Sequence, residues 1–341
     1  MTFRVQVRQL PAALDVAVGQ TILDAAQRAG YDYPCGCQSG NCGACKSVLL
    51  AGEVEMAPYS EFALSEAEKA SGLVLACRAV PWSAVEIAWL EADEVAAHAQ
   101  RQLTCRVAAI DAMTHDIKRV RLEIVSGGPF NFSAGQYAEV TFDGLPPRDF
   151  SMANQDGDGF VEFHIRAMAG GATSQYVQQR LKPGESVRVA GPRGISFLRE
   201  KHAGPIVALA GGSGLAPIKA IVERALALGL QQPISLYFGV RDERDLYLEA
   251  EFRHLAAQHG NFHFVPVLSE PSGPTARRTG FLADVLAQDF TSLDGAKLYL
   301  AGPPIMVESC VAAAARRGVR KEDCHADAFY TEADKARLAA Q

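Results

Sequence analysis

Several features that would place the chain in other classes of protein are missing from its sequence. The longest apolar run, Pro205–Leu215, is interrupted by three glycines and is too short to span a bilayer. The lysines and arginines form no cluster, and the formal net charge of -6 argues against a nucleic-acid partner. The N-terminal stretch Met1–Arg8 alternates apolar with polar residues and lacks the apolar segment of a secretory signal. We therefore expect a cytoplasmic protein without a membrane span, in which structural disulfides are disfavoured.

Four of the eight cysteines lie in the short stretch Tyr33–Cys45. Cys37, Cys42 and Cys45 follow a C-x4-C-x2-C spacing, and a lone Cys77 comes later in the chain. This combination is typical of a plant-type [2Fe-2S] site, in which one loop supplies three thiolates and a distant residue supplies the fourth. A zinc site is the alternative, although structural zinc sites more often pair two C-x2-C knuckles and the second pair is missing.

Cys35 is a competitor of Cys37 for the place of first ligand. Only Cys37 gives the four-residue interval to Cys42, so we assign Cys35 as a free neighbour on spacing alone. An isolated cysteine is usually a small buried hydrophobe. We expect this of the remaining three, which are Cys105, Cys310 and Cys324.

With 341 residues and an ordinary soluble composition, the chain is expected to form two or three domains. Residues 1–95 begin with an alternating strand, followed by a hairpin partner at Leu14–Val18. A helix over Ile22–Ala29 has Thr21 as its N-cap and Gly30 beyond its end. Further elements are expected at Ser47–Leu50, Ser65–Ala70 and Leu73–Cys77. The pattern predicts a small β-grasp-like α+β domain, with the cysteine loop directly after its helix.

A stretch without apolar period, Glu91–Arg101, is predicted to be a linker. Residues 101–201 then contain short strands separated by Gly and Pro turns, with one helix near Ser174–Leu181. Such strands at this spacing predict an antiparallel β-barrel. They are expected at Thr104–Ile110, Ile117–Ile124, Gly135–Phe142, Phe160–Arg166 and Ser186–Ala190.

Residues 202–341 alternate between strand and helix patterns, which predicts a doubly wound parallel sheet of the α/β class. The expected strands are Pro205–Ala210, Ile234–Val240, Phe262–Leu268 and Lys297–Ala301. The expected helices are Pro217–Leu228, Leu248–Gln258, Gly280–Ala287 and Pro304–Arg317.

Three segments of the barrel resemble motifs of the ferredoxin-NADP reductase superfamily: Arg148-Asp-Phe-Ser151, Phe163-His-Ile-Arg166 and Gly170-Gly-Ala-Thr-Ser174. The resemblance implies FAD, with Arg148 on its pyrophosphate, Phe150 packed on the isoalloxazine and Ser151 near flavin N5. It adds further FAD-binding candidates, which are His164, Arg166, Gly171, Thr173, Ser174 and Phe329. Phe150 stands where the family usually has tyrosine, so ring packing is retained without the hydroxyl. For Phe329 the alternative is an ordinary core aromatic.

The glycine-rich turn Ala210–Pro217 follows a predicted strand and opens a helix, where backbone amides can approach a pyrophosphate. A plain packing turn is the alternative. The turn resembles the nicotinamide-dinucleotide loop of the same superfamily, as Ala301–Met306 resembles its C-G-P-P-x-M signature, with Ala301 in place of cysteine. The resemblance implies NAD contacts by Gly212, Ser213, Gly214, Pro217, Arg241, Gly302, Pro303 and Met306.

This order of domains resembles the reductase components of bacterial multicomponent oxygenases. It implies electron flow from NADH to FAD, to the [2Fe-2S] cluster, and on to an oxygenase component, directly or through a separate ferredoxin. A reductase that serves a deoxysugar-nucleotide dehydratase and a redox sensor without turnover are the alternatives. NADH rather than NADPH is what the resemblance implies. Arg241 and Arg244 could hold a 2′-phosphate or simply face water, and the sequence has no clear acidic marker in their place. We expect the partner to dock on an exposed rim at Gln38–Asn41, near acidic side chains that could equally be simply solvated: Glu53, Glu55 and Glu61.

Overall fold

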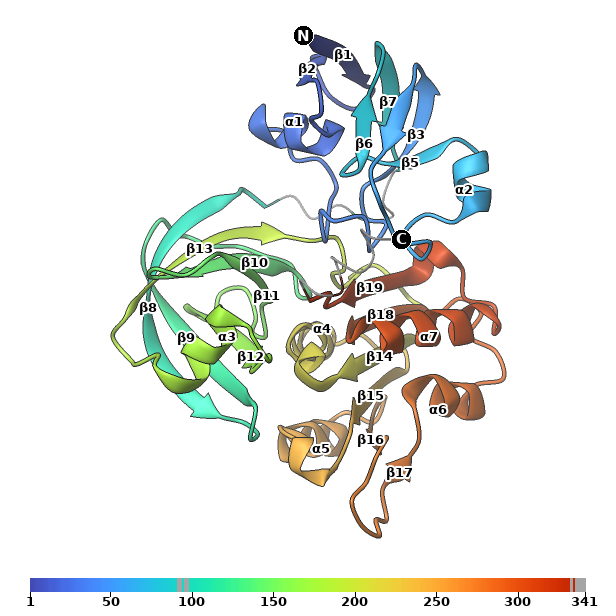
Figure 1. Ribbon diagram of the computed structural model, residues 1–341. Coiled ribbons are helices and arrows are strands. Elements are labelled where there is room, and N and C mark those ends of the chain that lie inside the picture. Colours follow the sequence, from blue (N-terminus) through green and yellow to red (C-terminus); the bar gives the residue numbers. More distant parts are fainter. Residues whose placement is uncertain (91–93, 95–97, 332–333, 335–341) are drawn as a thin grey trace. The chain divides into compact units, whose positions relative to one another are not determined.

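The computed structural model describes residues 1–90, 94, 98–331 and 334. By their contacts these residues form two units (Figure 1). The first holds the described residues of Met1–Val95 and those after Phe329, and the second holds the described residues of Ala96–Phe329. The linker expected at Glu91–Arg101 falls largely outside the described residues, and Arg101 already begins strand β8. The three domain boundaries expected from the sequence stay a proposal.

A five-stranded mixed sheet with strand order β2-β1-β7-β3-β5 forms the frame of the first unit. The central strands β1 and β7 are parallel, β1 and β2 form the expected antiparallel hairpin, and α1 buries Ile22 and Leu23 in the same core. This arrangement is the predicted β-grasp-like fold. The elements are β1 (Thr2–Val7), β2 (Leu14–Ala17), α1 (Ile22–Arg28), β3 (Lys46–Ala51), β4 (Val54–Met56), α2 (Glu66–Ala70), β5 (Leu73–Leu75), β6 (Ala79–Pro81) and β7 (Val85–Trp89).

Helix α1 has the ends that the sequence predicts. The Thr21 hydroxyl accepts a hydrogen bond from the Asp24 amide at 3.2 Å, which satisfies one of the free donors of the first turn. Beyond the helix Gly30 adopts a φ of +80°, a left-handed conformation that glycine takes at little cost. The chain therefore reverses direction here and enters the cysteine loop between α1 and β3.

The second unit begins with six antiparallel strands in the order β11-β10-β13-β8-β9-β12. An isolated bridge between Met152 and Phe163 draws the two edges of this sheet together, so the barrel is nearly closed. The short strand β11, which carries Arg148 to Ser151, was not expected. The elements are β8 (Arg101–Ala112), β9 (Ile117–Ser126), β10 (Tyr137–Phe142), β11 (Arg148–Ser151), β12 (Phe160–Arg166), α3 (Ala172–Gln179) and β13 (Ser186–Arg193).

The rest of the second unit is a parallel sheet with strand order β17-β16-β15-β14-β18-β19. Figure 1 shows α4 and α5 on one face of this sheet and α6 and α7 on the other. The strand order reverses between β14 and β18, and such a switch point is where open α/β sheets bind ligands. The elements are β14 (Ile206–Gly211), η1 (Gly212–Gly214), α4 (Leu215–Ala227), β15 (Ile234–Val240), η2 (Glu243–Asp245), α5 (Glu249–Gln258), β16 (Phe262–Leu268), β17 (Arg278–Thr279), α6 (Leu282–Asp289), β18 (Lys297–Gly302), α7 (Pro304–Ala315), η3 (Lys321–Asp323) and β19 (Cys324–Ala328).

Two helices begin two residues earlier than the sequence patterns predict. Helix α3 starts at Ala172 and α4 at Leu215, because Gly171 and Gly214 take the N-cap positions directly after their loops. Strands β17 and β19 were not expected. Within the part of the chain that the structure describes, every helix falls short of the length and apolarity needed to cross a bilayer.

Candidate functional site

The structure brings the four predicted cluster ligands together as two pairs of sulfur atoms. The thiols of Cys37 and Cys42 interact within one loop, and the thiol of Cys45 interacts with that of Cys77, which follows β5. Cys45 and Cys77 are buried, whereas Cys37 and Cys42 are half-buried. The two pairs suit a group that binds two protein thiolates at each of two irons.

Backbone amides of the loop point at these sulfur atoms. The Asn41 amide donates to Cys37 Sγ at 3.2 Å, and the Cys37 amide donates to Cys42 Sγ at 3.3 Å. Gly36 permits this closeness, since a Cβ there would lie 3.0 Å from Cys42 Sγ. Amide donors that converge on thiolates stabilise their negative charge, so the loop has the donor set that an iron-sulfur cluster needs.

Electrostatics of the first pair favour a thiolate at Cys37. Hydrogen bonds from the Cys42 thiol and from Ser39, with amide donation, lower the pKa of Cys37 to about 5. Cys35 has a different environment, because its Sγ faces the side-chain amides of Gln27 at 3.5 Å and Gln38 at 4.0 Å.

The rim expected at Gln38–Asn41 is less open than predicted. Gln38 and Ser39 are half-buried, and Asn41 is only 1% exposed. The prediction of an exposed rim is therefore wrong at Asn41. The carbonyl of this residue accepts a hydrogen bond from the Tyr330 hydroxyl.

Some of the predicted FAD residues of the barrel lie at the start of α3, close to the segment before Arg148. The Thr173 hydroxyl donates to the Pro146 carbonyl at 3.3 Å and holds the segment before Arg148 against the N-terminus of this helix. Arg148 is exposed. Within the described residues, its guanidinium donates a hydrogen bond only to the neighbouring Pro147 carbonyl. The N-cap residue Gly171 has no side chain that could accept hydrogen bonds from the first backbone amides of α3, so these amides stay available. A positive charge and free amides on one surface fit a pyrophosphate.

The last two residues of the motif, Phe150 and Ser151, place an aromatic ring and a hydroxyl group beside this surface. The half-buried Phe150 ring lies 6.2 Å from that of Phe163, measured between ring centroids. The Ser151 hydroxyl donates to Asp327 Oδ2 at 3.0 Å. Asp327 belongs to β19, so the barrel and the parallel sheet share this hydrogen bond. Phe329 follows on the same segment, half-buried against the sheet's core, and its amide donates to the Gly302 carbonyl at 2.9 Å.

His164 lies in the interior instead of on the FAD surface. Its side chain has no exposed area, Nε2 lies 3.2 Å from Glu162 Oε1, and Nδ1 lies 3.2 Å from the Tyr247 hydroxyl. Burial lowers the pKa of His164, so the imidazole is neutral at pH 7. Although burial by itself raises it, hydrogen bonds from His164 and Arg121 bring the pKa of Glu162 down to about 2. A contact between His164 and FAD is therefore restricted to its main chain, on the edge strand β12.

Arg166 ends the same strand and faces the parallel sheet. Its Nε donates to Asp116 Oδ2 at 2.7 Å, and a Cβ on Gly212 would lie 3.1 Å from its Nη1. The guanidinium thus lies against the glycine-rich turn, where it can serve either dinucleotide.

The predicted NAD residues gather at the switch point. A Cβ on Gly214 would collide with the Ala301 carbonyl oxygen, and one on Gly302 would lie 2.9 Å from the Gly211 carbonyl oxygen. Pro303 and Met306 close against Gly211 in the same way. The two turns can approach only because glycine occupies these positions. Ser213 lies in the turn, and Pro217 is buried in the first turn of α4.

Arg241 leaves the end of β15 beside two acidic residues. Its exposed guanidinium lies 3.9 Å from Asp245 Oδ2, and its carbonyl accepts a 2.8 Å hydrogen bond from the amide of Glu270. Glu270 is exposed in the loop that follows β16. The carboxyl ends of β15 and β16 are adjacent, so the backbone of Glu270, an acidic residue that the sequence analysis did not connect with Arg241, lies beside it.

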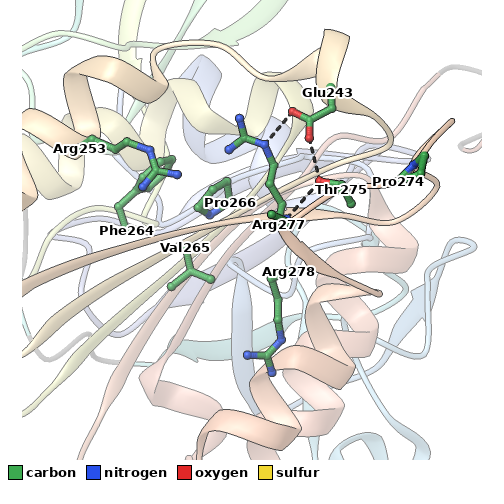
Figure 2. Close-up of a pocket in the computed structure, with 10 residues that line it drawn as sticks. Glu243, Arg253, Phe264, Val265, Pro266, Pro274, Thr275, Arg277 and Arg278 are labelled. Atoms are coloured by element: carbon green, nitrogen blue, oxygen red, sulfur yellow. Dashed lines mark hydrogen bonds and ion pairs between the residues drawn. The ribbon is translucent and has the colours of Figure 1, made fainter.

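A cavity of about 590 Å³ lies beside β16 and the segment that leads into β17 (Figure 2). Figure 2 shows the Glu243 carboxylate pointing toward Arg277 and Thr275, which also line the cavity. The arginines that line it are paired with carboxylates: Arg277 Nε lies 2.6 Å from Glu243, Arg278 2.8 Å from Asp289, and Arg253 2.7 Å from Glu249. These pairs leave the cavity little net attraction for a phosphate, so we keep the dinucleotide site at the switch point.

Sequence reasoning missed the partners of several predicted residues. Asp327 comes into place through the strand pairing of β19, and Tyr247 and Glu270 through the turns that follow β15 and β16. The available signals were two motifs that resemble the family, Gly239–Tyr247 and His325–Phe329. They contain Tyr247 and Asp327 but do not say that these residues meet His164 and Ser151.

Three family models match successive parts of the chain. A 2Fe-2S iron-sulfur cluster binding domain matches residues 5–81. An oxidoreductase FAD-binding domain matches residues 104–197, and an oxidoreductase NAD-binding domain matches residues 208–312. The cluster loop, the FAD surface and the switch point fall within these three ranges in that order.

Curated relatives match nearly the whole chain. The reductase component of naphthalene 1,2-dioxygenase/salicylate 5-hydroxylase systems from Ralstonia is 41% identical, covering 95% of this chain and 98% of its own. The corresponding component of the naphthalene 1,2-dioxygenase system from Pseudomonas putida is 37% identical, over 92% and 94%. A crystal structure of a cytochrome P450 reductase from Amycolatopsis is 38% identical, with a TM-score of 0.78 over 96% of this chain and 99% of its own. The chain therefore belongs to the family of oxygenase reductase components, oxidoreductases in which a 2Fe-2S domain precedes FAD-binding and NAD-binding domains.

Proposed function

We propose that this protein takes electrons from NADH and delivers them singly to an aromatic-ring oxygenase component, directly or through a separate ferredoxin. The observation that carries the proposal is that one chain holds a thiolate loop, a pyrophosphate-binding surface with an aromatic wall and a glycine-built dinucleotide turn. The printed names of the relatives favour an oxygenase over a deoxysugar dehydratase as the partner. A cytoplasmic setting is part of the proposal, because free thiolates persist in a reducing compartment.

The first unit would hold the cluster through two cysteine pairs. Cys37 and Cys42 would bind one iron, and Cys45 and Cys77 the other. The amides of Cys37 and Asn41 would donate to the bound sulfur atoms and raise the reduction potential of the site. Cys35 stays outside the ligand set.

The second unit would hold FAD on the surface between β11 and α3. Arg148 and the amides after Gly171 would bind the pyrophosphate, with Thr173 and Ser174 shaping the turn and Phe150 packing on the ring system. Asp327 orients the Ser151 hydroxyl, so a proton can be held at Ser151 Oγ where we place flavin N5. When bound, FAD accepts a hydride and gives up single electrons.

Glu270 supports NADH as the reductant. Its backbone lies next to Arg241, and a carboxylate at this position could accept a hydrogen bond from a ribose 2′-hydroxyl and would repel a 2′-phosphate. Initial rates with the two dinucleotides test this choice. We expect the wild-type protein to react faster with NADH than with NADPH, and Glu270→Gln to reduce the ratio of the two rates. A faster rate with NADPH in the wild-type protein would overturn the choice of NADH.

An anaerobic titration with NADH tests the proposed function as a whole. The flavin absorbance and the cluster absorbance at longer wavelength are both expected to bleach, because NADH supplies a pair of electrons and the cluster accepts them one at a time through the flavin. Cluster absorbance that persists in excess NADH would contradict the proposal, because electrons would then stop at the flavin.

A further inference from the structure

The chain's C-terminal segment reaches the cluster loop through Tyr330. The Tyr330 hydroxyl donates to the backbone carbonyl of Asn41 at 3.4 Å, and the backbone amide of Asn41 donates to Cys37 Sγ at 3.2 Å. Tyr330 follows Phe329 directly, and it belongs by its contacts to the first unit. A residue far from the cysteines in sequence therefore binds the same asparagine whose backbone amide donates to a proposed iron ligand.

Hydrogen bonds join Thr331, which follows Tyr330, to Asp334. The Thr331 amide and hydroxyl both donate to Asp334 Oδ2, at 3.0 Å and 2.6 Å, and the Asp334 amide donates back to the Thr331 hydroxyl at 3.1 Å. This reciprocal pattern is a capping box, which sets the direction of the backbone as it leaves Tyr330. Thr331, the residue next to the tyrosine, is thus held by three hydrogen bonds to Asp334.

Asn41 depends on this contact because its own side chain contributes little to holding it. Asn41 is 1% exposed, its Nδ2 donates to Ser39 within the same loop at 3.0 Å, and its Oδ1 is buried with no hydrogen-bond partner among the described residues. Its main chain therefore carries the bonds to groups outside the loop. Loss of the Tyr330 bond would leave a second buried oxygen unsatisfied, which favours rearrangement of the loop.

We propose that Tyr330 is a positioning residue for the iron-sulfur cluster, which acts through Asn41 to hold the amide that donates to Cys37 Sγ. The inference rests on the proposed cluster site. Hydrogen bonds to cluster sulfur raise the reduction potential, and residues behind the ligands tune a metal centre through such bonds. Tyr330 thereby favours electrons reaching the cluster, and it has no part in reduction of the flavin by NADH.

The test compares Tyr330→Phe with the wild-type full chain and with Tyr31→Phe. Tyr31 is half-buried against the core of the same unit, and the structure shows no hydrogen bond for its hydroxyl within the described residues, which makes it a matched control. The readouts are iron content, the EPR spectrum of the dithionite-reduced protein and a potentiometric titration of the cluster. We expect Tyr330→Phe to shift the equilibrium for cluster reduction about tenfold toward the oxidised form, about 59 mV for one electron. The Tyr31 variant keeps the wild-type potential.

A second variant, Tyr330→Leu, removes the ring as well as the hydroxyl, and we expect a larger shift or loss of iron with the flavin retained. A wild-type potential and EPR spectrum in both Tyr330 variants would overturn the inference. Absence of iron and sulfide from the wild-type protein would instead overturn the cluster site itself, so the two failures are distinguishable. Equal rates of flavin reduction by NADH in all variants show that the second unit is intact.

Discussion

The two units hold their proposed cofactors by opposite means. In the first unit, sulfur atoms from one loop and from Cys77 lie together as two pairs, and backbone amides of the same loop donate to those of Cys37 and Cys42. In the second unit, glycines and amides from several elements form the binding surfaces, and a key pair, Ser151 with Asp327, joins residues 176 positions apart. The first site depends on a few side chains, whereas the second depends on the packing of a whole fold.

This difference separates two kinds of damage. Removing one sulfur atom takes away one of the four proposed ligands, and each iron needs its full set of thiolates. Altering the second site changes a distance or an orientation, so its effects should be graded and should leave the first unit untouched.

The largest effect is expected from Cys77→Ser. Loss of one of the proposed four ligands should remove the cluster or make it labile, while NADH still reduces the flavin. Cytochrome c and ferricyanide are the acceptors to compare: reduction of cytochrome c through the cluster should fall by at least about tenfold, and reduction of ferricyanide by the flavin should persist. Cys35→Ser is the matched control and should keep the cluster. An unchanged cluster spectrum in Cys77→Ser, or its loss in Cys35→Ser, would show that the ligand set is wrong.

Gly214→Ala should damage the second site without affecting the first. The new Cβ would collide with the Ala301 carbonyl oxygen, and such overpacking costs about 1–3 kcal/mol. We expect the KM for NADH to rise about tenfold or more as the two turns separate, with the cluster spectrum unchanged. Gly260→Ala serves as control, because a Cβ there meets nothing within 4 Å. Equal KM values for the two variants would argue against a dinucleotide at the switch point.

Ser151→Ala should slow flavin reduction more moderately. It removes the hydroxyl that Asp327 orients, and a positioned proton-transfer group contributes at least about a hundredfold when it acts directly. Stopped-flow measurement of flavin reduction should show a decrease approaching this size, with a smaller one in Asp327→Asn, which can still accept a hydrogen bond. Ser126→Ala, at an exposed position of the same barrel, should react at the wild-type rate. A wild-type rate in Ser151→Ala would remove the hydroxyl from the mechanism.

The smallest effect concerns pH and the buried His164. Because burial lowers its pKa in the folded state, the unfolded chain binds a proton more readily, and stability is lost as the pH falls below the ordinary value of 6.5. Glu162 has a folded pKa of about 2 against an ordinary 4.5, so its contribution is present above pH 4.5 and is lost between these values. The second unit should therefore lose stability in two stages on acidification.

Flavin fluorescence during thermal unfolding can follow the second unit separately, because both tryptophans, Trp82 and Trp89, lie in the first. His164→Gln should show a smaller loss of stability than the wild type as the pH is lowered through the ordinary histidine value of 6.5, although it is less stable above that value. His254→Gln, which changes an exposed histidine on α5, should keep the wild-type pH dependence. The same pH dependence of thermal stability in all three proteins would mean that His164 does not control the loss of stability below pH 6.5.

Much of the fold was accessible from the sequence because its signals are local. The cap at Thr21, the reversal at Gly30 and the alternation of strands with helices each depend on residues within a few positions, and the structure confirms them. The short strands β11, β17 and β19 were missed, since two to five residues carry too weak a pattern and are stabilised by their neighbours in the sheet.

The sequence by itself determined which chemistry the chain can hold: cysteine spacing indicates a cluster, and the glycine turns with Arg148 indicate dinucleotides. Only the tertiary structure decided which distant groups support them. It joins Ser151 to Asp327, places Glu270 beside Arg241, and brings Tyr330 to Asn41. It also moves His164 from the expected FAD surface into the interior. The reason is physical: ligand type is written in side-chain chemistry and short spacings, whereas these contacts depend on the pairing of strands and the packing of turns from remote parts of the chain.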